Sequence, residues 1–352
     1  MPAAASAADR PNRNFTSLPN LARRRERERC VSCSRRQIIA TALAIGVSSP
    51  HLAFAQSYPN RPVTLVTSFA AGSPQDLVLR AIADIVASEF KQPAVVDNKP
   101  GASGGVAMAA SVTQKPDGYA LNVSTSAGLA NLPLMQKLAF DPAKDFDYLM
   151  QMASFPIGIA VKAESPFKSW ADLVAHAKAN PGKVTYGTPG AGSMANLGMQ
   201  RLQALAGISL THVPHKGVME IIPAVLGDHV ALMVTGTEWK PLVDAGQMRL
   251  LMMWTDKRLA SFPNVATARE SGYPFELDVS FGLVAPKGLE PMVAAQVQGA
   301  FKKALETPSV RALMEKYNMV PAYLDGAAFK ARMASIAADM KPVIEQLGLL
   351  AK

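Results

Sequence analysis

The sequence is poor in cysteine: Cys30 and Cys33 are the only two among 352 residues. Both lie in an arginine-rich stretch near the start of the chain. A C-x-x-C pair can carry redox chemistry or supply half of a zinc site. No second pair follows it, so neither chemistry is favoured. The chain after Cys33 contains no cysteine, and disulfides therefore cannot stabilise the main body.

The sequence also lacks a hydrophobic run long enough to cross a membrane. Its clearest apolar run, Ile38–Val47, has about ten residues, whereas a spanning helix needs roughly 20. Basic residues precede this run, and Ala53-Phe54-Ala55 follows it. This order is typical of a signal peptide, so we predict export to the periplasm and cleavage after Ala55. The Ser34–Ile39 stretch resembles a twin-arginine signal, which leaves the export route and the true translation start open.

A strong charge of one sign is missing from the rest of the chain. Residues 1–55 hold nine arginines against three acidic residues, and the remaining residues hold 27 basic and 24 acidic groups. The net charge of +9 is therefore mostly that of the segment predicted to be removed. A mild excess of +3 over the body does not indicate a nucleic-acid surface.

The body alternates strand-like and helix-like segments, which predicts a parallel sheet covered on both faces. Expected strands are Val63–Phe69, Ala94–Val96, Tyr119–Val123, Pro156–Val161, Lys183–Gly187, Val230–Val234 and Phe281–Pro286. Expected helices are Pro74–Phe90, one from about Val106, Ser169–Ala179, Met194–Leu205, part of Leu210–Leu226, and 289–306, 308–317 and 327–348, the last kinked at Pro342. The pattern predicts two lobes, the second inserted into the first.

Two strand-to-helix junctions have the character of anion sites. Ser73 precedes Pro74 at one helix start, with Asp76 in the position of a capping box. Ser193 precedes a second helix after a glycine-rich loop that begins near Thr188. Free backbone N–H groups at such helix ends attract a carboxylate. Facing each other across a cleft, one junction per lobe, they would suit a small anion, although each could be an ordinary capped helix.

Other motifs carry weaker signals. The hydroxyl groups of residues 124–126 follow an expected strand. They are placed to line the crevice at its carboxyl end, and the alternative is an ordinary polar loop. Gly101–Gly105 matches the G-x-S-x-G elbow of serine hydrolases, with Ser103 as the nucleophile. Lys99-Pro100 stands where the elbow needs a strand, which disfavours that interpretation. His212 and His215 could bind a metal, but no third ligand is spaced nearby. The glycine-rich loop after Thr188 contains neither G-x-G-x-x-G nor G-x-x-x-x-G-K-[ST], which disfavours a nucleotide site.

From Tyr58 onward the chain resembles the Bug/TctC family, the extracytoplasmic receptors of tripartite tricarboxylate transporters. The matching stretches are 58–63, 69–76 with Arg80, 96–101, 116–119, 141–146, 177–183, 186–193, 212–217, 245–246 and 282–286. Each is short, but they occur in order along essentially all of residues 57–350. The ordered set is therefore highly specific.

The resemblance implies an α/β fold of the type-2 periplasmic-binding-protein class, with two lobes and a hinged cleft. We expect residues 56–158 and 281–352 to form the first lobe and 159–280 the second, with hinges near Pro156–Val161 and Ser280–Val284. In this family the loops at Phe69–Asp76 and Thr188–Asn196 hold the carboxylates of the ligand. The expected ligand-binding residues are Phe69, Ala71, Gly72, Ser73, Asp76, Thr125, Ser126, Thr188, Gly192, Ser193, Asn196 and Gly217.

Several positions depart from the family pattern. Ala70–Ser73 stands where Pro-Pro-Gly-Gly is usual, Asn196 replaces a histidine and His215 a tyrosine. Met233-Val234-Thr235 replaces Met-Phe-Asp. All these positions are in or near the expected cleft, so they leave the ligand open among di- or tricarboxylates, acidic amino acids and aromatic carboxylates.

The resulting expectation is a monomeric receptor without catalytic residues, metal or cofactor, which delivers a carboxylate to membrane transporter subunits. Two alternatives stay open on the sequence: a secreted serine hydrolase using Ser103 and a sensor subunit for a signalling partner. An esterase assay with a Ser103→Ala variant would separate the hydrolase from the receptor.

Overall fold

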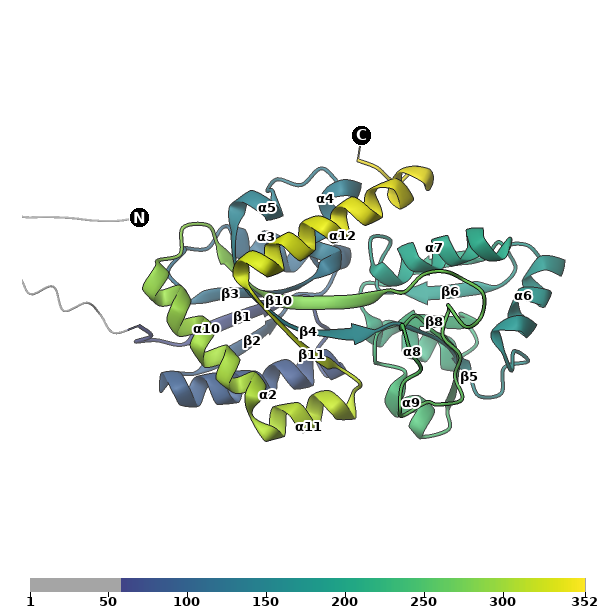
Figure 1. The fold of residues 1–352 in the computed structure, drawn as a ribbon, viewed down its shortest axis with the longest axis horizontal. Helices are drawn as coiled ribbons and strands as arrows, with labels where there is room; N and C mark the ends of the chain where they lie inside the picture. The colour runs from purple at the N-terminus through teal and green to yellow at the C-terminus, as the bar shows by residue number, and fades with distance from the viewer. Residues whose placement is uncertain (1–57, 352) are drawn as a thin grey trace, which may run out of the picture. The chain divides into compact units, whose positions relative to one another are not determined.

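The computed structural model describes residues 58–351. The predicted signal peptide, its cysteine pair and the cleavage position all lie outside these residues. Tyr58–Ala351 contains two sheets, each with its own helices (Figure 1). No helix among residues 58–351 is both long and apolar enough to cross a membrane.

The larger sheet has six strands in the order β11-β4-β10-β3-β1-β2. They are β1 (Val63–Thr67), β2 (Ala94–Asn98), β3 (Ala120–Thr125), β4 (Phe146–Pro156), β10 (Asp278–Pro286) and β11 (Val320–Asp325). β1 pairs in parallel with β2 and β3, whereas β10 is antiparallel to β3 and β4, and β11 is antiparallel to β4. The predicted parallel arrangement holds for β1, β2 and β3 and was wrong for β4, β10 and β11, so the sheet is mixed. β4 runs toward the second sheet and β10 returns from it beside β4, so the two must be antiparallel.

The smaller sheet has five strands in the order β7-β6-β8-β5-β9. They are β5 (Gly158–Lys162), β6 (Thr185–Thr188), β7 (Thr211–Pro214), β8 (Leu232–Thr235) and β9 (Met248–Met253). β6 is parallel to β7 and β8, and β5 is antiparallel to β8 and β9. This sheet is mixed as well. We refer to the two sheets with their helices as lobe 1 and lobe 2.

Helices cover both faces of the larger sheet (Figure 1). Its helical segments are α2 (Pro74–Phe90), η1 (Ala102–Gly104), α3 (Gly105–Val112), η2 (Ala127–Asn131), α4 (Leu132–Met135), α5 (Pro142–Asp145), α10 (Pro291–Glu306), α11 (Pro308–Lys316) and α12 (Gly326–Gln346). Those of lobe 2 are α6 (Trp170–Ala179), α7 (Met194–Ala206), α8 (Val218–Leu226) and α9 (Lys240–Asp244). In Figure 1, α2, α10 and α11 lie below the larger sheet, and α3 and α12 lie above it.

Helix α2 illustrates how the sequence pattern places these elements. Its bounds are those predicted from the apolar spacing, and Val78, Leu79, Ile82 and Val86 are completely buried. Such spacing forms one apolar face on a helix and drives it onto the sheet. The predicted cap of α6 is confirmed too, because Ser169 and Asp172 form a capping box. Helix α12 contains Pro342 without interruption, and the kink there stays a prediction.

Two chain crossings join the sheets, and they lie side by side. The first is at Ile157, between β4 and β5. The second ends at Leu277, directly before β10. The amide of Trp254 donates to the Ile157 carbonyl at 3.0 Å, and the Leu277 amide donates to the Trp254 carbonyl at 2.9 Å. The two crossings are therefore tied together by backbone hydrogen bonds.

Candidate functional site: a pocket between two helix N-termini

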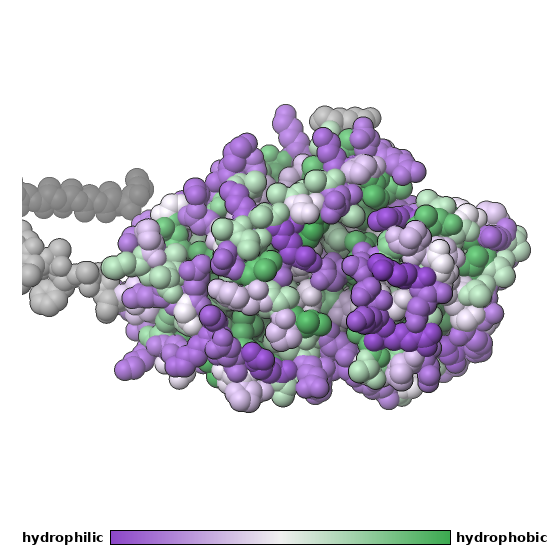
Figure 2. Space-filling model, in the orientation of Figure 1, coloured by the Kyte–Doolittle hydropathy of each residue, from purple (hydrophilic) through white to green (hydrophobic). Residues whose placement is uncertain are grey.

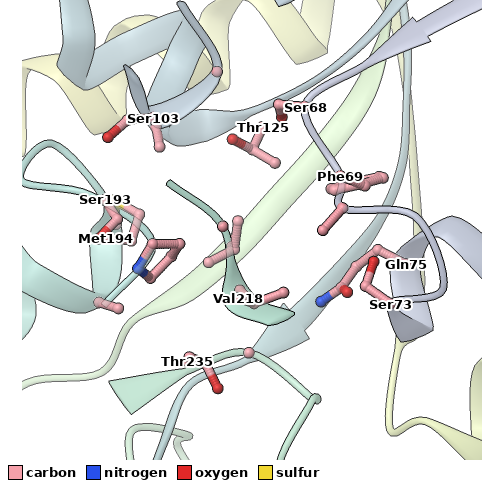
Figure 3. A pocket seen from close by; sticks show the side chains of 18 of the residues that line it. Ser68, Phe69, Ser73, Gln75, Ser103, Thr125, Ser193, Met194, Val218 and Thr235 are labelled. Carbon is pink, nitrogen blue, oxygen red and sulfur yellow. The ribbon is translucent and has the colours of Figure 1, made fainter. Parts of the chain in front are cut away.

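A pocket lies between the two sheets and receives residues from both (Figure 3). Lobe 1 contributes the loops after β1, β2 and β3 and the first turn of α2. Lobe 2 contributes the first turns of α7 and α8 and the segment after β8. Figure 3 shows Ser68, Ser73, Gln75, Ser103 and Thr125 around one side and Ser193, Met194, Val218 and Thr235 around the other. Both lobes thus bring small polar side chains to a wall that is otherwise largely apolar.

The N-terminus of α2 presents one backbone N–H to this pocket. Ser73 is the N-cap, and its Oγ accepts a hydrogen bond from the Asp76 amide at 3.3 Å. Pro74 has no N–H, and the Leu77 amide donates to the Ser73 carbonyl. The first amides of a helix have no partner within the helix. The amide left for a ligand is therefore that of Gln75, whose residue lines the pocket.

The N-terminus of α7 presents two backbone N–H groups to the pocket. Ser193 Oγ accepts from the Asn196 amide at 3.2 Å and donates to the Gly190 carbonyl at 2.7 Å. The Leu197 amide donates to the Ser193 carbonyl. The amides of Met194 and Ala195 remain, and both residues line the pocket. Two adjacent amides at the positive end of a helix match the two oxygens of a carboxylate.

Asp76 supports the loop before α2 and does not line the pocket. Its Oδ2 accepts from the Gly72 amide and from Arg80 Nε, both at 2.9 Å, and its Oδ1 accepts from Asn98 Nδ2 at 2.7 Å. Burial raises the pKa of Asp76, but the hydrogen bonds of Arg80, Asn98 and Gly72 outweigh it, so the pKa is lowered below its usual value. The carboxylate is thus an ionised structural element behind the binding loop.

Thr188 and Asn196 support the loop of lobe 2 in the same way. Thr188 Oγ1 lies 3.1 Å from the Gly190 carbonyl and 2.7 Å from His212 Nε2. Asn196 accepts from the Tyr186 hydroxyl at 2.9 Å and donates to the Ala191 carbonyl at 2.7 Å. Burial and the neighbouring His215 lower the pKa of His212 to about 4, so this imidazole is neutral at neutral pH and holds the loop through a hydrogen bond.

The structure therefore divides the expected site residues into two groups. Those on the pocket wall are Phe69, Ser73, Thr125, Ser193 and Gly217. Those outside the wall are Ala71, Gly72, Asp76, Ser126, Thr188, Gly192 and Asn196. Members of the second group shape the loops that carry the first group. The sequence patterns predict the positions of these loops. They do not indicate which atoms of the loops already form hydrogen bonds within the protein.

The lobes meet closely at four glycines around the pocket, among them Gly192, where a Cβ would lie 3.2 Å from Ser103 Oγ. A Cβ on Gly190 would lie 2.9 Å from Ser103 Oγ, and one on Gly217 would lie 3.6 Å from Ala70 Cβ. A Cβ on Gly236 would lie 2.6 Å from the Phe155 ring. In addition, Asn131 Nδ2 lies 2.9 Å from Met194 Sδ. These contacts join the lobes around the pocket.

Comparison with known proteins identifies the family of this chain. The family model described as the tripartite tricarboxylate transporter family receptor matches residues 78–349. The chain belongs to this receptor family. A relative from Cupriavidus necator, named for its place in the gbd 5′ region, is 38% identical over 317 residues, which are 90% of this chain and 97% of the relative. The predicted membership of a solute-binding receptor family is confirmed.

Solved structures of similar proteins confirm the fold of this receptor. A Rhodopseudomonas palustris protein solved with malate has a TM-score of 0.76 and 25% identity, covering 82% of this chain and all of that one. An R. palustris protein solved with adipate has a TM-score of 0.80 and 26% identity, covering 84% of this chain and all of that one. The predicted α/β fold of two lobes is therefore borne out.

Ser103, considered above as a hydrolase nucleophile, lies on the pocket wall of this receptor. It follows β2 after an intervening loop, in the short turn η1, and no hydrogen bond joins it to a histidine in Tyr58–Ala351. Ala102 and Ser103 both have positive φ, 47° and 52°. Left-handed backbone is unusual for such residues and recurs at ligand sites. Ser103 lies opposite Gly190 and therefore takes part in the contact between the lobes.

Other wall residues of the receptor were missed by the sequence analysis. They are Ser68, Gln75, Met194, Ala195, Lys216, Val218, Thr235, Gly236 and Glu238, among others. Four of them follow directly from the helix-end argument, because they occupy the first turns of α2, α7 and α8: Gln75, Met194, Ala195 and Val218. Thr235 belongs to the stretch 233–235 that departs from the family pattern, and Gly236 and Glu238 follow it, so that departure was the available signal.

No group of three or more potential metal-ligating His, Cys, Asp or Glu side chains occurs among the residues that the structure describes. His212 is engaged with Thr188, as described above. His215 Nδ1 lies 3.9 Å from Glu220. The two histidines considered as metal ligands thus have contacts within lobe 2.

Proposed function

We propose that this protein is the exported receptor of a tripartite tricarboxylate transporter and that it binds a small carboxylate between its lobes. The observation that carries the proposal is the pair of serine-capped helix N-termini, α2 and α7, that reach one pocket from opposite lobes. The adipate and malate in the two related structures are both carboxylates. They support this ligand class for a chain of the same family.

In the proposed mechanism, the ligand carboxylate first binds the Met194 and Ala195 amides at α7. Closure then brings the α2 end, Ser103 and Thr125 onto the rest of the ligand. The paired crossings at Ile157 and Leu277 are the hinge, since they are the covalent connections between lobes 1 and 2. Affinity comes from donors that are already aimed and from exclusion of water. No bond is made or broken, so the proposed role is binding and not catalysis.

The closed receptor delivers the ligand to membrane subunits of the transporter. The mature chain begins at Gln56 after removal of residues 1–55 and acts as a monomer. On the face seen in Figure 2, hydrophobic residues are scattered among hydrophilic ones. That face therefore has no large apolar patch of the kind that a subunit interface needs, which supports the proposed monomer. Mass spectrometry of the exported chain is expected to find Gln56 at its N-terminus, and a retained leader would contradict this.

A thermal-shift screen of the mature chain against C4–C6 carboxylates and their neutral diamides tests the proposed ligand class. A ligand at 100 times its Kd stabilises the folded chain by about 2.7 kcal/mol. We expect a dose-dependent rise in Tm with at least one carboxylate and none with the corresponding diamide. If no small carboxylate raises Tm at millimolar concentration, the proposed function is wrong. Hydrolysis of a general ester substrate that Ser103→Ala abolishes would favour the hydrolase instead.

Ser193→Ala is expected to weaken ligand binding while lowering stability only modestly. Loss of an N-cap hydroxyl costs about 1 kcal/mol, and here it also releases the Gly190 carbonyl, so the loop that aims the Met194 and Ala195 amides loosens. We expect roughly a tenfold loss of affinity by calorimetry.

Ser169→Ala is the matched control. Ser169 Oγ accepts the same capping hydrogen bond, from the amide three residues on, at the start of α6, but Ser169 lies outside the pocket. It should lower stability by a similar amount and leave affinity unchanged. Equal affinities for the Ser193→Ala variant and the unmodified chain would contradict the role given to the α7 end.

A further inference from the structure

Glu238 is a buried carboxyl group on the pocket wall that the proposed binding mechanism does not use. It lies just after β8, and the residue is 3% exposed. Its Oε2 is buried and has no hydrogen-bond partner among residues 58–351. Thr235 Oγ1, on the same wall, is also buried without a partner in that range. Each such atom loses water on burial and is left uncompensated.

The surroundings of Glu238 supply dipoles but no ion pair. Gln75 from α2 faces its carboxyl group from lobe 1, and Thr235 and the Gly236 backbone face it from lobe 2. Burial raises the pKa of Glu238, and the polar groups of Gln75, Thr235 and Gly236 that face it oppose this. Lys216 is the other charged residue of the wall, and no salt bridge joins it to Glu238 within the described chain. Figure 3 shows Gln75 and Thr235 on opposite sides of Val218.

The close approach of Gly236 to lobe 1 fixes where this carboxyl group sits. A Cβ on Gly236 would lie 3.1 Å from Gln75 Nε2 as well as against Phe155. Gln75 is also the residue whose backbone amide remains free at the α2 end. The protein therefore places an acid group of its own beside the helix end where a second ligand carboxylate would otherwise go.

The unpartnered Oε2 and the acidic character of Glu238 together restrict which ligand groups can bind beside it. An ionised carboxyl group offers only acceptors. Two carboxylates in one desolvated site repel each other, and one of them must take up a proton. A ligand N–H or O–H would instead satisfy Oε2 and Thr235 Oγ1 directly. The two helix ends are thus unequal, since α7 has two amides for a ligand carboxylate and α2 has an acid beside its single amide.

We propose that Glu238 is a specificity-determining residue that selects a ligand with one carboxylate and an N–H or O–H donor at its other end, against dicarboxylates of the same length. The inference rests on the proposed function, because it assumes that the α7 end binds a carboxylate. Glu238 Oε2 and Thr235 Oγ1 are the groups that accept or share the hydrogen bonds of the donor end.

Matched ligand pairs test this inference directly. Succinate, glutarate and adipate are each compared by calorimetry at pH 8 with their monoamides, which differ only in one terminal group. The unmodified mature chain should bind its best monoamide at least tenfold more tightly than the dicarboxylate of that length. In Glu238→Gln, the acid is replaced by an amide that can donate, so this preference should fall by at least tenfold. The control Glu306→Gln, on an exposed position of α10, should keep it.

Three results would overturn the inference. One is tighter binding of a dicarboxylate than of its monoamide by the unmodified chain at pH 8. Another is a preference that Glu238→Gln leaves unchanged. The third is dicarboxylate binding that dominates at low pH with uptake of one proton, which would make protonated Glu238 a donor to a second carboxylate. These results leave carboxylate binding intact, whereas absence of binding by every member of the panel would contradict the proposed function itself.

Discussion

Gly236→Ala is expected to reduce ligand affinity by roughly tenfold to a hundredfold while the unliganded chain stays folded. The added Cβ would lie 2.6 Å from the Phe155 ring of β4, closer than unstrained atoms approach. Crowding of this kind costs about 1–3 kcal/mol. The clash lies between lobe 2 and lobe 1 beside the Ile157 crossing, so it strains the arrangement in which both lobes reach the ligand. Its cost therefore falls on ligand binding.

Calorimetric Kd and the Tm of the unliganded chain, measured together, check this expectation. Gly299→Ala is the matched control, because a Cβ there meets nothing within 4 Å and the position lies within α10. It should keep the original affinity and should slightly stabilise the helix. Unchanged affinity in Gly236→Ala, or a drop in unliganded stability as large as the loss of binding energy, would argue against closure at this contact.

Asp76→Asn is expected to destabilise the folded chain by about 3 kcal/mol, since it removes one partner of a buried charge network. Asp76 is 1% exposed and accepts hydrogen bonds from Gly72, Arg80 and Asn98. An asparagine has one oxygen, so its NH₂ group must face at least one of these donors. Asp84→Asn, at an exposed position of the same helix, should change stability by less than about 0.5 kcal/mol. Urea unfolding of both variants measures the difference.

The same network predicts a loss of stability in acid. The pKa of Asp76 is lower in the folded chain than its usual 3.8, so the unfolded chain binds the proton first. Its contribution is complete above that usual value and disappears as the pH falls through the lower folded value. Below pH 4 the unmodified chain should therefore lose stability faster than Asp76→Asn does. Parallel acid dependences would contradict an ionised, structural Asp76.

Periodicity and capping correctly predicted the elements whose signals lie in their own stretch of sequence. Helix α2 has both an apolar face and a Ser73-Pro74 start, and its bounds were predicted correctly. The long strand β4 was missed except near its end, and β9 and β11 were missed as well. Their hydrogen-bond partners lie far away in the chain, as in the pairing of β4 with β10 and β11. Pairing between distant segments decides such strands, and a local pattern does not contain it.

The candidate site was predictable to the level of loops. Serine after a glycine-rich loop marks a helix start, and both Ser73 and Ser193 lie on the pocket wall. Asp76 and Asn196 have the same sequence signal, yet their side chains bind the protein itself. Local sequence cannot tell which side of a loop a polar group faces. Glu238 was missed for a related reason, since only the approach of lobe 1 makes its surroundings dry.

A crystal structure of the mature chain with its tightest carboxylate from the screen tests the binding model most directly. The model predicts both carboxylate oxygens within about 3.2 Å of the Met194 and Ala195 nitrogens, which is the reach of an N–H···O hydrogen bond. It also predicts that the other end of the ligand lies toward Gln75. A ligand bound outside this pocket, or one whose carboxylate points away from the start of α7, would contradict it.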